Sequence, residues 1–177
     1  MLVILRSFFD GGNKADSRVY GNLSLAAVSA TVDEWGPFER DWGEMLRGHH
    51  ADYLHTTDAV SRKNDFDGWT KDEVDSFLRD CARITAKHSI RLSREYYPDQ
   101  FGIYAFTASI TLKDFVEFAK NNPSLSQDAN EGLIRQAIGN TLLWSKDKAS
   151  CDEMHCFFDQ GERFYGYFDV ALRMRIP

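Results

Sequence analysis

The sequence predicts a single α/β domain in which helices pack on a mixed sheet. Three observations support this fold class: apolar and β-branched segments open the chain, amphipathic helical stripes follow, and strands then alternate with helices. This order is typical of a sheet covered by helices. A chain of 177 residues can bury a core of its own, so we expect residues 1–177 to form one domain.

The chain opens with two predicted strand regions. Residues 2–9 are mostly apolar and predict a buried strand that ends at Asp10, where Gly11 and Gly12 introduce a turn. Residues 19–32 are rich in small and β-branched side chains and predict one or two further strands. We expect these strands to return antiparallel to the first.

Helical patterns dominate the middle of the chain. Pro37 suits the first turn of a helix that includes residues 35–46, whereas residues 51–55 predict a short strand. A second helix is predicted over about 71–87, with acidic residues early and basic residues late, as the helix dipole favours. The apolar stripes of the two helices are Trp35, Phe38, Trp42, Met45 and Leu46, and Val74, Phe77, Leu78, Cys81 and Ile84.

The last part of the chain alternates strands with helices. Strands are predicted at 90–94 and 101–112, and the second of them leads into a helix that ends at residues 121–123, Asn-Asn-Pro. Ser126 can cap the next helix. Residues 155–158 then predict a final strand. The apolar stripe of the last helix is Leu133, Ile134, Ala137, Ile138 and Leu142.

Charge and composition limit the expected partners and location. The net charge is −6, and an acidic chain binds phosphate backbones poorly because such binding needs a basic surface. No apolar run approaches the roughly 20 residues of a membrane helix, and no signal peptide is indicated. The three cysteines suit a reducing compartment. We expect a cytoplasmic protein whose partner is a nucleic acid or another protein, with no membrane association.

A repeated motif is the most informative feature of the sequence. Phe8-Phe9-Asp10-Gly11 and Phe157-Phe158-Asp159-Gln160-Gly161 each place an aspartate at the exit of an apolar strand. If the two strands are parallel neighbours, both carboxylates leave the sheet at one edge, where ligands bind in α/β sheets. A divalent cation would compensate their mutual repulsion, and oxygen donors favour Mg²⁺ or Mn²⁺. The alternative is that each aspartate only begins a turn.

This pattern makes a geometric prediction. Asp10 and Asp159 should lie on adjacent parallel strands, with their carboxyl oxygens close enough to share one ion or an ion pair roughly 3.5–4 Å apart. Such an ion can activate water and stabilise charge on a phosphoryl group. Glu162, three residues after Asp159, can point into the same cleft or lie exposed on a loop.

His55 and Asp58 form a second candidate site in the segment Leu54-His55-Thr56-Thr57-Asp58. His55 can act as a proton shuttle or metal ligand, with Asp58 beside it. In the structural alternative, Asp58 or a threonine caps a turn and His55 is a partly buried, hydrogen-bonded residue. A zinc site is not predicted, because the spacing of Cys151, His155 and Cys156 fits no common structural zinc pattern.

Four basic residues can contact a phosphate backbone, although a solvated face is the favoured explanation of them. They are Arg83, Lys87, Arg91 and Arg94.

Read in order, these segments resemble the bacterial and phage family catalogued as domain of unknown function 3800. Its members begin with a strand ending in Asp-Glu-Ser-Gly and continue with an apolar strand, a helix, a His-containing strand and a later strand ending in Asp. The counterparts are Phe9-Asp10-Gly11-Gly12, Leu25-Ala26-Ala27-Val28, Leu54-His55 and Phe158-Asp159. The resemblance implies a ribonuclease H-like fold and, by analogy, metal-dependent nuclease chemistry.

Two departures from the family pattern bear on activity. Gly11 stands where the motif has Glu, and the chain reaches Pro177 without the Ala-Asp-containing helix that many members have. Our main hypothesis is a Mg²⁺- or Mn²⁺-dependent phosphodiesterase in which Asp10 and Asp159 bind metal, Asp58 or Glu162 completes the ligand shell, and His55 transfers protons. The alternative is a catalytically inactive protein-interaction module, for instance in conflict between phage and host.

Overall fold

The computed structural model of the chain divides into two compact units. We call Met1–Val32 together with Tyr104–Pro177 the sheet unit, and Asp33–Ile103 the helical unit. The residues that the structure describes are 4–12, 21–89, 102–124, 128–148 and 152–158.

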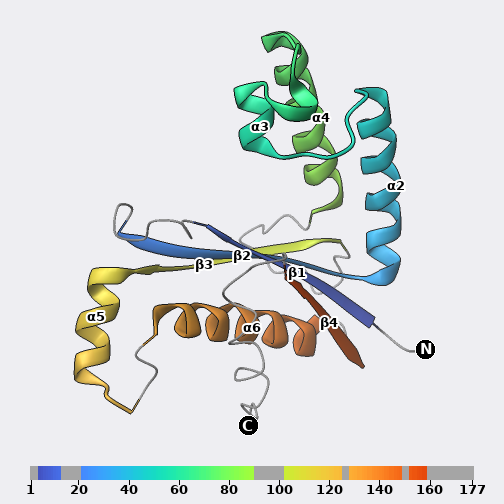
Figure 1. Ribbon diagram of the computed structural model, residues 1–177. Helices are drawn as coiled ribbons and strands as arrows, with labels where there is room; N and C mark the ends of the chain where they lie inside the picture. The colour runs from blue at the N-terminus through green and yellow to red at the C-terminus, as the bar shows by residue number, and fades with distance from the viewer. Residues whose placement is uncertain (1–3, 13–20, 90–101, 125–127, 149–151, 159–177) are drawn as a thin grey trace. The chain divides into compact units, whose positions relative to one another are not determined.

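A four-stranded mixed sheet is the centre of the sheet unit (Figure 1). Its strands are β1 (Ile4–Gly12), β2 (Asn22–Thr31), β3 (Tyr104–Thr111) and β4 (Glu153–Phe158), in the order β3-β2-β1-β4. The first three strands pair antiparallel, whereas β4 lies parallel to β1. The predicted α/β class with a mixed sheet is therefore confirmed, as is the antiparallel return of the second strand.

Helix α6 (Ala129–Lys148) covers one face of this sheet (Figure 1). Successive strand residues point to opposite faces, so every second apolar residue can reach the helix. The buried core on this face consists of Phe9, Leu23, Leu25, Ala27 and Ala108 from the strands, and Ala129, Leu133, Ile134, Ala137 and Ile138 from α6. The apolar stripe predicted for this helix is thus the part of it that faces the sheet.

The opposite side of the sheet, which we call the second face, carries the alternate residues of each strand. Near the carboxyl end of β1, several described side chains of this face are exposed, whereas those that point toward α6 are buried. These exposed residues are Phe8, Asp10, Ala26, Ala105, Thr107 and Phe157. This face is therefore the accessible side of the end of β1.

Helix α5 (Leu112–Asn121) follows β3 directly. Its end at Asn121 agrees with the helix stop predicted from the Asn-Asn-Pro sequence. Ser126, the predicted cap of the next helix, and the strand predicted over 90–94 lie outside the described residues.

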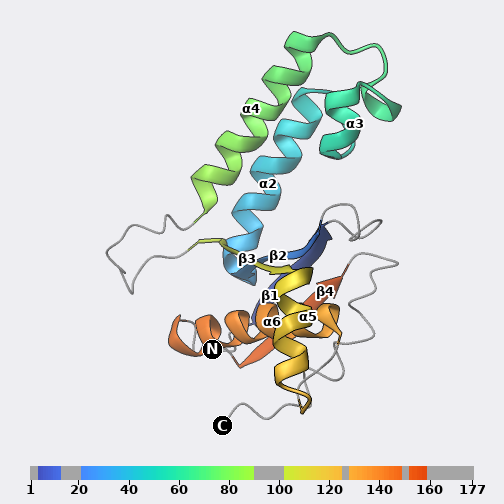
Figure 2. The same ribbon diagram turned by 90° about the vertical axis from the view of Figure 1, so that its left-hand side faces the viewer.

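The described part of the helical unit contains three α-helices and a short 3₁₀ helix. They are α2 (Val32–Gly48), α3 (Thr56–Ser61), η1 (Asn64–Phe66) and α4 (Lys71–His88). Figures 1 and 2 show α2 and α4 side by side. The core between them is lined by the predicted stripes, with Met45 from α2 and Val74, Phe77, Cys81 and Ile84 from α4. The helix predicted over 71–87 is confirmed.

Two local predictions in this unit are wrong. Pro37 lies inside α2 rather than in its first turn, because β2 leads into the helix without a loop and the helix starts at Val32. Residues 51–55 do not form a strand. Ala51 instead donates a backbone hydrogen bond to the Leu46 carbonyl and is buried in the helical core, where no neighbouring strand is described for this segment to pair with.

The helical unit interrupts the sheet between two strands that pair with each other. β2 ends at Thr31 and β3 begins at Tyr104, and Ser29 is paired with Tyr104. Both borders of the inserted unit therefore fall at strand ends, and no Gly- or Pro-rich linker marks them in the sequence. Within the described ranges, no helix is long and apolar enough to cross a membrane.

Candidate functional site

Asp10 lies near the carboxyl end of β1, at the centre of the sheet. Alternation along the strand places it on the second face with Phe8, whereas Phe9 points into the core under α6. Across the sheet Asp10 is paired with Ala26, and Ala26 with Thr107. Small and hydroxyl side chains thus flank the exposed carboxylate on the β2 side.

The second aspartate of the repeated motif, Asp159, follows β4 in the sequence, and β4 pairs parallel to β1. Phe8 is paired with Phe157 and Phe9 with Phe158, so the repeated motif runs in register on two adjacent parallel strands. This confirms the predicted relation of the two strands. Asp159 follows Phe158 directly but lies outside the described residues, so the predicted separation of the two carboxylates stays a prediction. Glu162 also lies outside them.

The two phenylalanine pairs of the motif differ in solvent exposure because they lie on opposite faces of the sheet. Phe9 and Phe158 stack at a ring-centroid distance of 4.9 Å and belong to the core beside α6. Phe8 and Phe157 stack at 4.8 Å on the second face, where they are 38% and 42% exposed. The motif therefore supplies both a core contact and an exposed aromatic pair.

His55 and Asp58 are brought together within the helical unit. His55 precedes the first turn of α3, and its Nδ1 lies 2.9 Å from the Asp58 carboxylate. Asn64 donates a second hydrogen bond of 2.8 Å to the same carboxylate oxygen. The bonds from Asn64 and His55 lower the pKa of Asp58. The pair is therefore a local polar cluster, and its predicted catalytic role stays a prediction.

The cysteine and histidine residues near β4 do not share one ion. His155 and Cys156 are consecutive strand residues, so their side chains point to opposite faces of the sheet. Cys156 packs against the core, and burial raises the pKa of its thiol to about 12. Cys151 lies outside the described residues. Among the residues that are described, no three His, Cys, Asp or Glu side chains form a group that could hold a metal ion.

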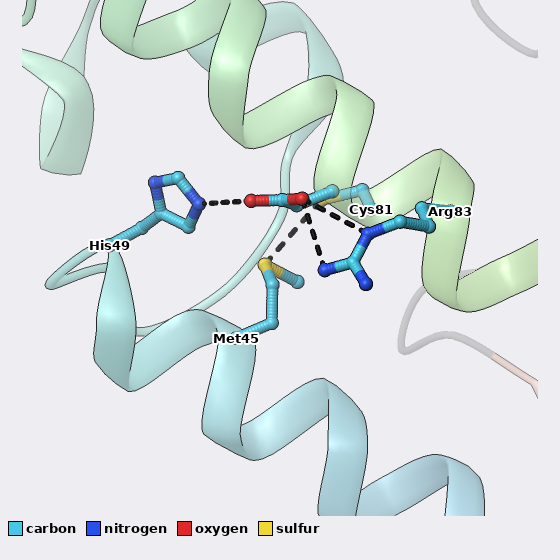
Figure 3. A network of polar contacts seen from close by, with 5 residues as sticks. Met45, His49, Cys81 and Arg83 are labelled. Atoms are coloured by element: carbon cyan, nitrogen blue, oxygen red, sulfur yellow. Dashed lines mark hydrogen bonds and ion pairs between the residues drawn. The ribbon is translucent and has the colours of Figure 1, made fainter.

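A polar network in the helical unit was not foreseen from the sequence (Figure 3). His49, at the end of α2, lies 3.0 Å from the Asp80 carboxylate, to which Arg83 also donates. Behind this bridge the Cys81 thiol contacts the Met45 sulfur at 4.0 Å. His49 and Asp80 are 31 positions apart along the chain, and Met45 and Cys81 are 36 positions apart. No local sequence pattern therefore marks either contact.

Two of the four basic residues considered as phosphate contacts have partners within the helical unit. Arg83 bonds to Asp80, and Lys87 bonds to Asp41 at 2.5 Å. The two side chains are 73% and 63% exposed, so they belong to solvated ion pairs on the helix surface. Arg91 and Arg94 lie outside the described residues.

Comparison of the chain with protein-family models, with curated proteins and with solved structures found no match.

Proposed function

We propose that this chain is a metal-dependent phosphodiesterase of the ribonuclease H-like class, with nucleic acid as its substrate. The observation that carries the proposal is the in-register parallel pairing of β1 with β4, which sets Phe9 opposite Phe158. If this register continued by one residue, Asp10 would stand beside Asp159. The strand order supports the proposal, since the two motif strands, β1 and β4, are neighbours in the sheet.

Asp10 fits the role of a metal ligand. Its carboxylate is exposed at the carboxyl end of a central strand, where ligands of α/β sheets bind, and carboxylate oxygens are donors that Mg²⁺ and Mn²⁺ prefer. Asp10 and Asp159 would hold the ion, and Glu162 is a candidate for a further oxygen. When bound, such an ion supplies an activated water and stabilises charge on the phosphoryl oxygens.

His55 is the proposed proton carrier. Asp58 holds its Nδ1, which would fix the ring's orientation and leave Nε2 as the nitrogen that exchanges protons. Because the ring side chain is 61% exposed, a substrate group or a water could reach it. Asp58 is then a positioning residue for His55, and a direct ligand role for Asp58 is the less favoured part of the hypothesis.

The test is a thermal melt in chelator and in Mn²⁺, for the wild type and for Asp10→Asn. The substitution keeps the shape of the side chain but removes a charged oxygen ligand. We expect Mn²⁺ to raise the Tm of the wild type and to leave that of the variant unchanged, because only the folded protein with the Asp10 carboxylate binds the ion. Removing the charge should also raise the Tm in chelator if the two carboxylates repel each other.

Glu117→Gln is the matched control, since Glu117 is an exposed acid on α5 of the same unit. Its response to Mn²⁺ should equal that of the wild type. Hydrolysis of a labelled oligonucleotide in Mn²⁺ is the second readout and should be lost in Asp10→Asn. Equal metal responses of the wild type and Asp10→Asn would contradict the metal site.

The second candidate function is a catalytically inactive protein-interaction module. Gly11 favours it, because this position lacks the acid of the motif that the chain resembles. In that case the wild type should show neither a Tm response to Mn²⁺ nor hydrolysis, and Asp10→Asn should behave like the wild type in both measurements.

A further inference from the structure

Two exposed aromatic rings lie next to the candidate metal ligand. Phe8 and Phe157 come from adjacent strands, their ring centroids are 4.8 Å apart and their planes differ by 17°. Both are about two-fifths exposed, at 38% and 42%. Phe8 is two residues before Asp10 on the same face of β1, so their Cα atoms are about 7 Å apart. One nucleotide can cover this distance.

The surroundings of the pair are unlike a protein-docking surface. On the second face Phe8 is paired with the half-buried Val28, and the small, exposed residues Ala26, Ala105 and Thr107 lie beside Val28 and Asp10. A helix or a second sheet would need a broad set of large apolar side chains to pack against. The row Phe157, Phe8 and Val28 is narrow, and its two phenyl rings offer an aromatic surface onto which a flat ring can stack.

We propose that Phe8 and Phe157 bind unpaired bases beside Asp10, and therefore that the substrate is a single-stranded nucleic acid. This rests on the proposed function and names its substrate class. In a duplex the bases are already stacked and paired, so exposed protein rings cannot reach their faces without unstacking them. Stacking of bases on aromatic side chains is tolerant of sequence, because every base has a flat π-face.

The charge of the chain limits what the phosphate backbone can contribute to binding. With a net charge of −6, contacts to the phosphate backbone cannot supply most of the affinity. A substrate held by its bases and by a metal ion at Asp10 would need fewer basic residues. His155 lies on the same face of β4 two residues before Phe157 and is 43% exposed, so a polar ring continues the surface away from Asp10.

The experiment measures binding of a fluorescein-labelled oligodeoxythymidine by fluorescence anisotropy in chelator, so that no hydrolysis occurs. The proteins are the wild type, Phe8→Ala, Phe157→Ala and the double variant. Removing a stacked ring costs at least ~1 kcal/mol per base, which is roughly a fivefold rise in Kd. We expect each single variant to weaken binding by about this factor or more, and Phe8→Trp to retain it.

Phe118→Ala is the matched control, because Phe118 is also an exposed phenylalanine, at 51%, on α5 of the same unit. Its Kd should equal that of the wild type. The corresponding DNA duplex should bind more weakly than the single strand. Unfolding temperatures of all variants, which should stay close to that of the wild type, show that a loss of binding is not a loss of fold.

The outcomes separate this proposal from the proposed function. If Asp10→Asn abolishes hydrolysis while the double phenylalanine variant binds as the wild type does, the enzyme stands and the base-stacking surface is wrong. If the rings are needed for binding but no metal-dependent hydrolysis occurs, the surface stands and the phosphodiesterase is wrong. A wild-type dimer that the double variant turns into a monomer would overturn the inference, because a second copy would then cover the rings.

Discussion

Asp41 shows how single residues join the helices of the helical unit. Its carboxylate, on α2, lies 2.5 Å from Lys87 Nζ and 2.8 Å from His88 Nε2, both at the end of α4. Hydrogen bonds from Lys87 and then His88 lower the pKa of Asp41 from 3.8 to about 2. The His88 ring also meets Phe38 edge to face, so the polar contact continues into the aromatic cluster.

This shift predicts how the protein unfolds in acid. A carboxyl group whose folded pKa is lowered stabilises the fold above its unfolded pKa and loses that contribution as the pH falls through its folded pKa. For Asp41 the window runs from about pH 4 to about pH 2. Asp41→Asn should lower the Tm at neutral pH, and the difference from the wild type should shrink across this window.

Thermal melts between pH 7 and pH 2 measure the effect. Glu44→Gln, which changes an exposed acid of the same helix, is the control and should follow the wild type. A Tm difference between wild type and Asp41→Asn that stays constant down to pH 2 would contradict the assignment.

At the scale of elements, a buried polar pair lies between β1 and β2. Ser29 donates a hydrogen bond of 2.8 Å to the Ser7 hydroxyl, and both side chains are fully buried on the face covered by α6. The two residues are direct partners in the antiparallel register. A slip of one residue between the two strands would put the two hydroxyls on opposite faces and break their hydrogen bond, so the pair favours the observed alignment of the strands.

A double-mutant cycle tests this pair. Ser7→Ala or Ser29→Ala alone leaves one buried hydroxyl without this partner, which should lower the free energy of unfolding by about 1–3 kcal/mol. The double variant removes both hydroxyls and should cost clearly less than the sum of the single changes, by about 0.5 kcal/mol or more. Urea unfolding of the four proteins provides the values. Additive effects would show that the two hydroxyls are energetically independent.

Most elements were predictable because each has a local signal. The apolar stripe of α6 and the acidic start and basic end of α4 lie within single segments, and both helices are where the sequence predicts them. Residues 51–55 show the limit of this method. A short apolar segment fits a strand, but whether it becomes one depends on a neighbouring strand that only the tertiary structure can provide.

The same limit applies to the candidate site. An aspartate that follows an apolar run, at Asp10, is visible in the sequence, and so is its repeat. The turn predicted at Gly11 and Gly12 is wrong, because β1 continues to Gly12 and pairs with β2 there. Which of Phe8 and Phe9 would be exposed is not visible, because both are apolar and only the position of α6 decides between the two faces. The bridge from His49 to Asp80 joins separate helices and has no local signature.

At the scale of the whole molecule, the two units have separate hydrophobic cores. Phe77 is fully buried in the core of the helical unit, and Leu133 in that of the sheet unit. Phe77→Ala should lower stability by about 3–5 kcal/mol and Leu133→Ala by about 2–5 kcal/mol. We expect each loss to appear mainly in the unit that carries the substitution, because the described residues of each core come from one unit.

Hydrogen exchange followed by mass spectrometry localises these losses. Phe77→Ala should reduce protection in peptides from residues 33–103, and Leu133→Ala in peptides from β1, β2 and α6. Equal loss of protection in both units from either variant would show that the chain unfolds as one cooperative body.

The hydrogen bond between Glu34 and Gly102 has a consequence for folding kinetics. The Glu34 carboxylate, in the first turn of α2, accepts the backbone N–H of Gly102 at the other end of the helical unit. Pairing β2 with β3 requires closure of a long loop, and such closures slow folding. If the helical unit folds first, this bond holds the two ends of that unit together. The strands β2 and β3, which flank the unit in the chain, can then pair as quickly as the strands of a short hairpin.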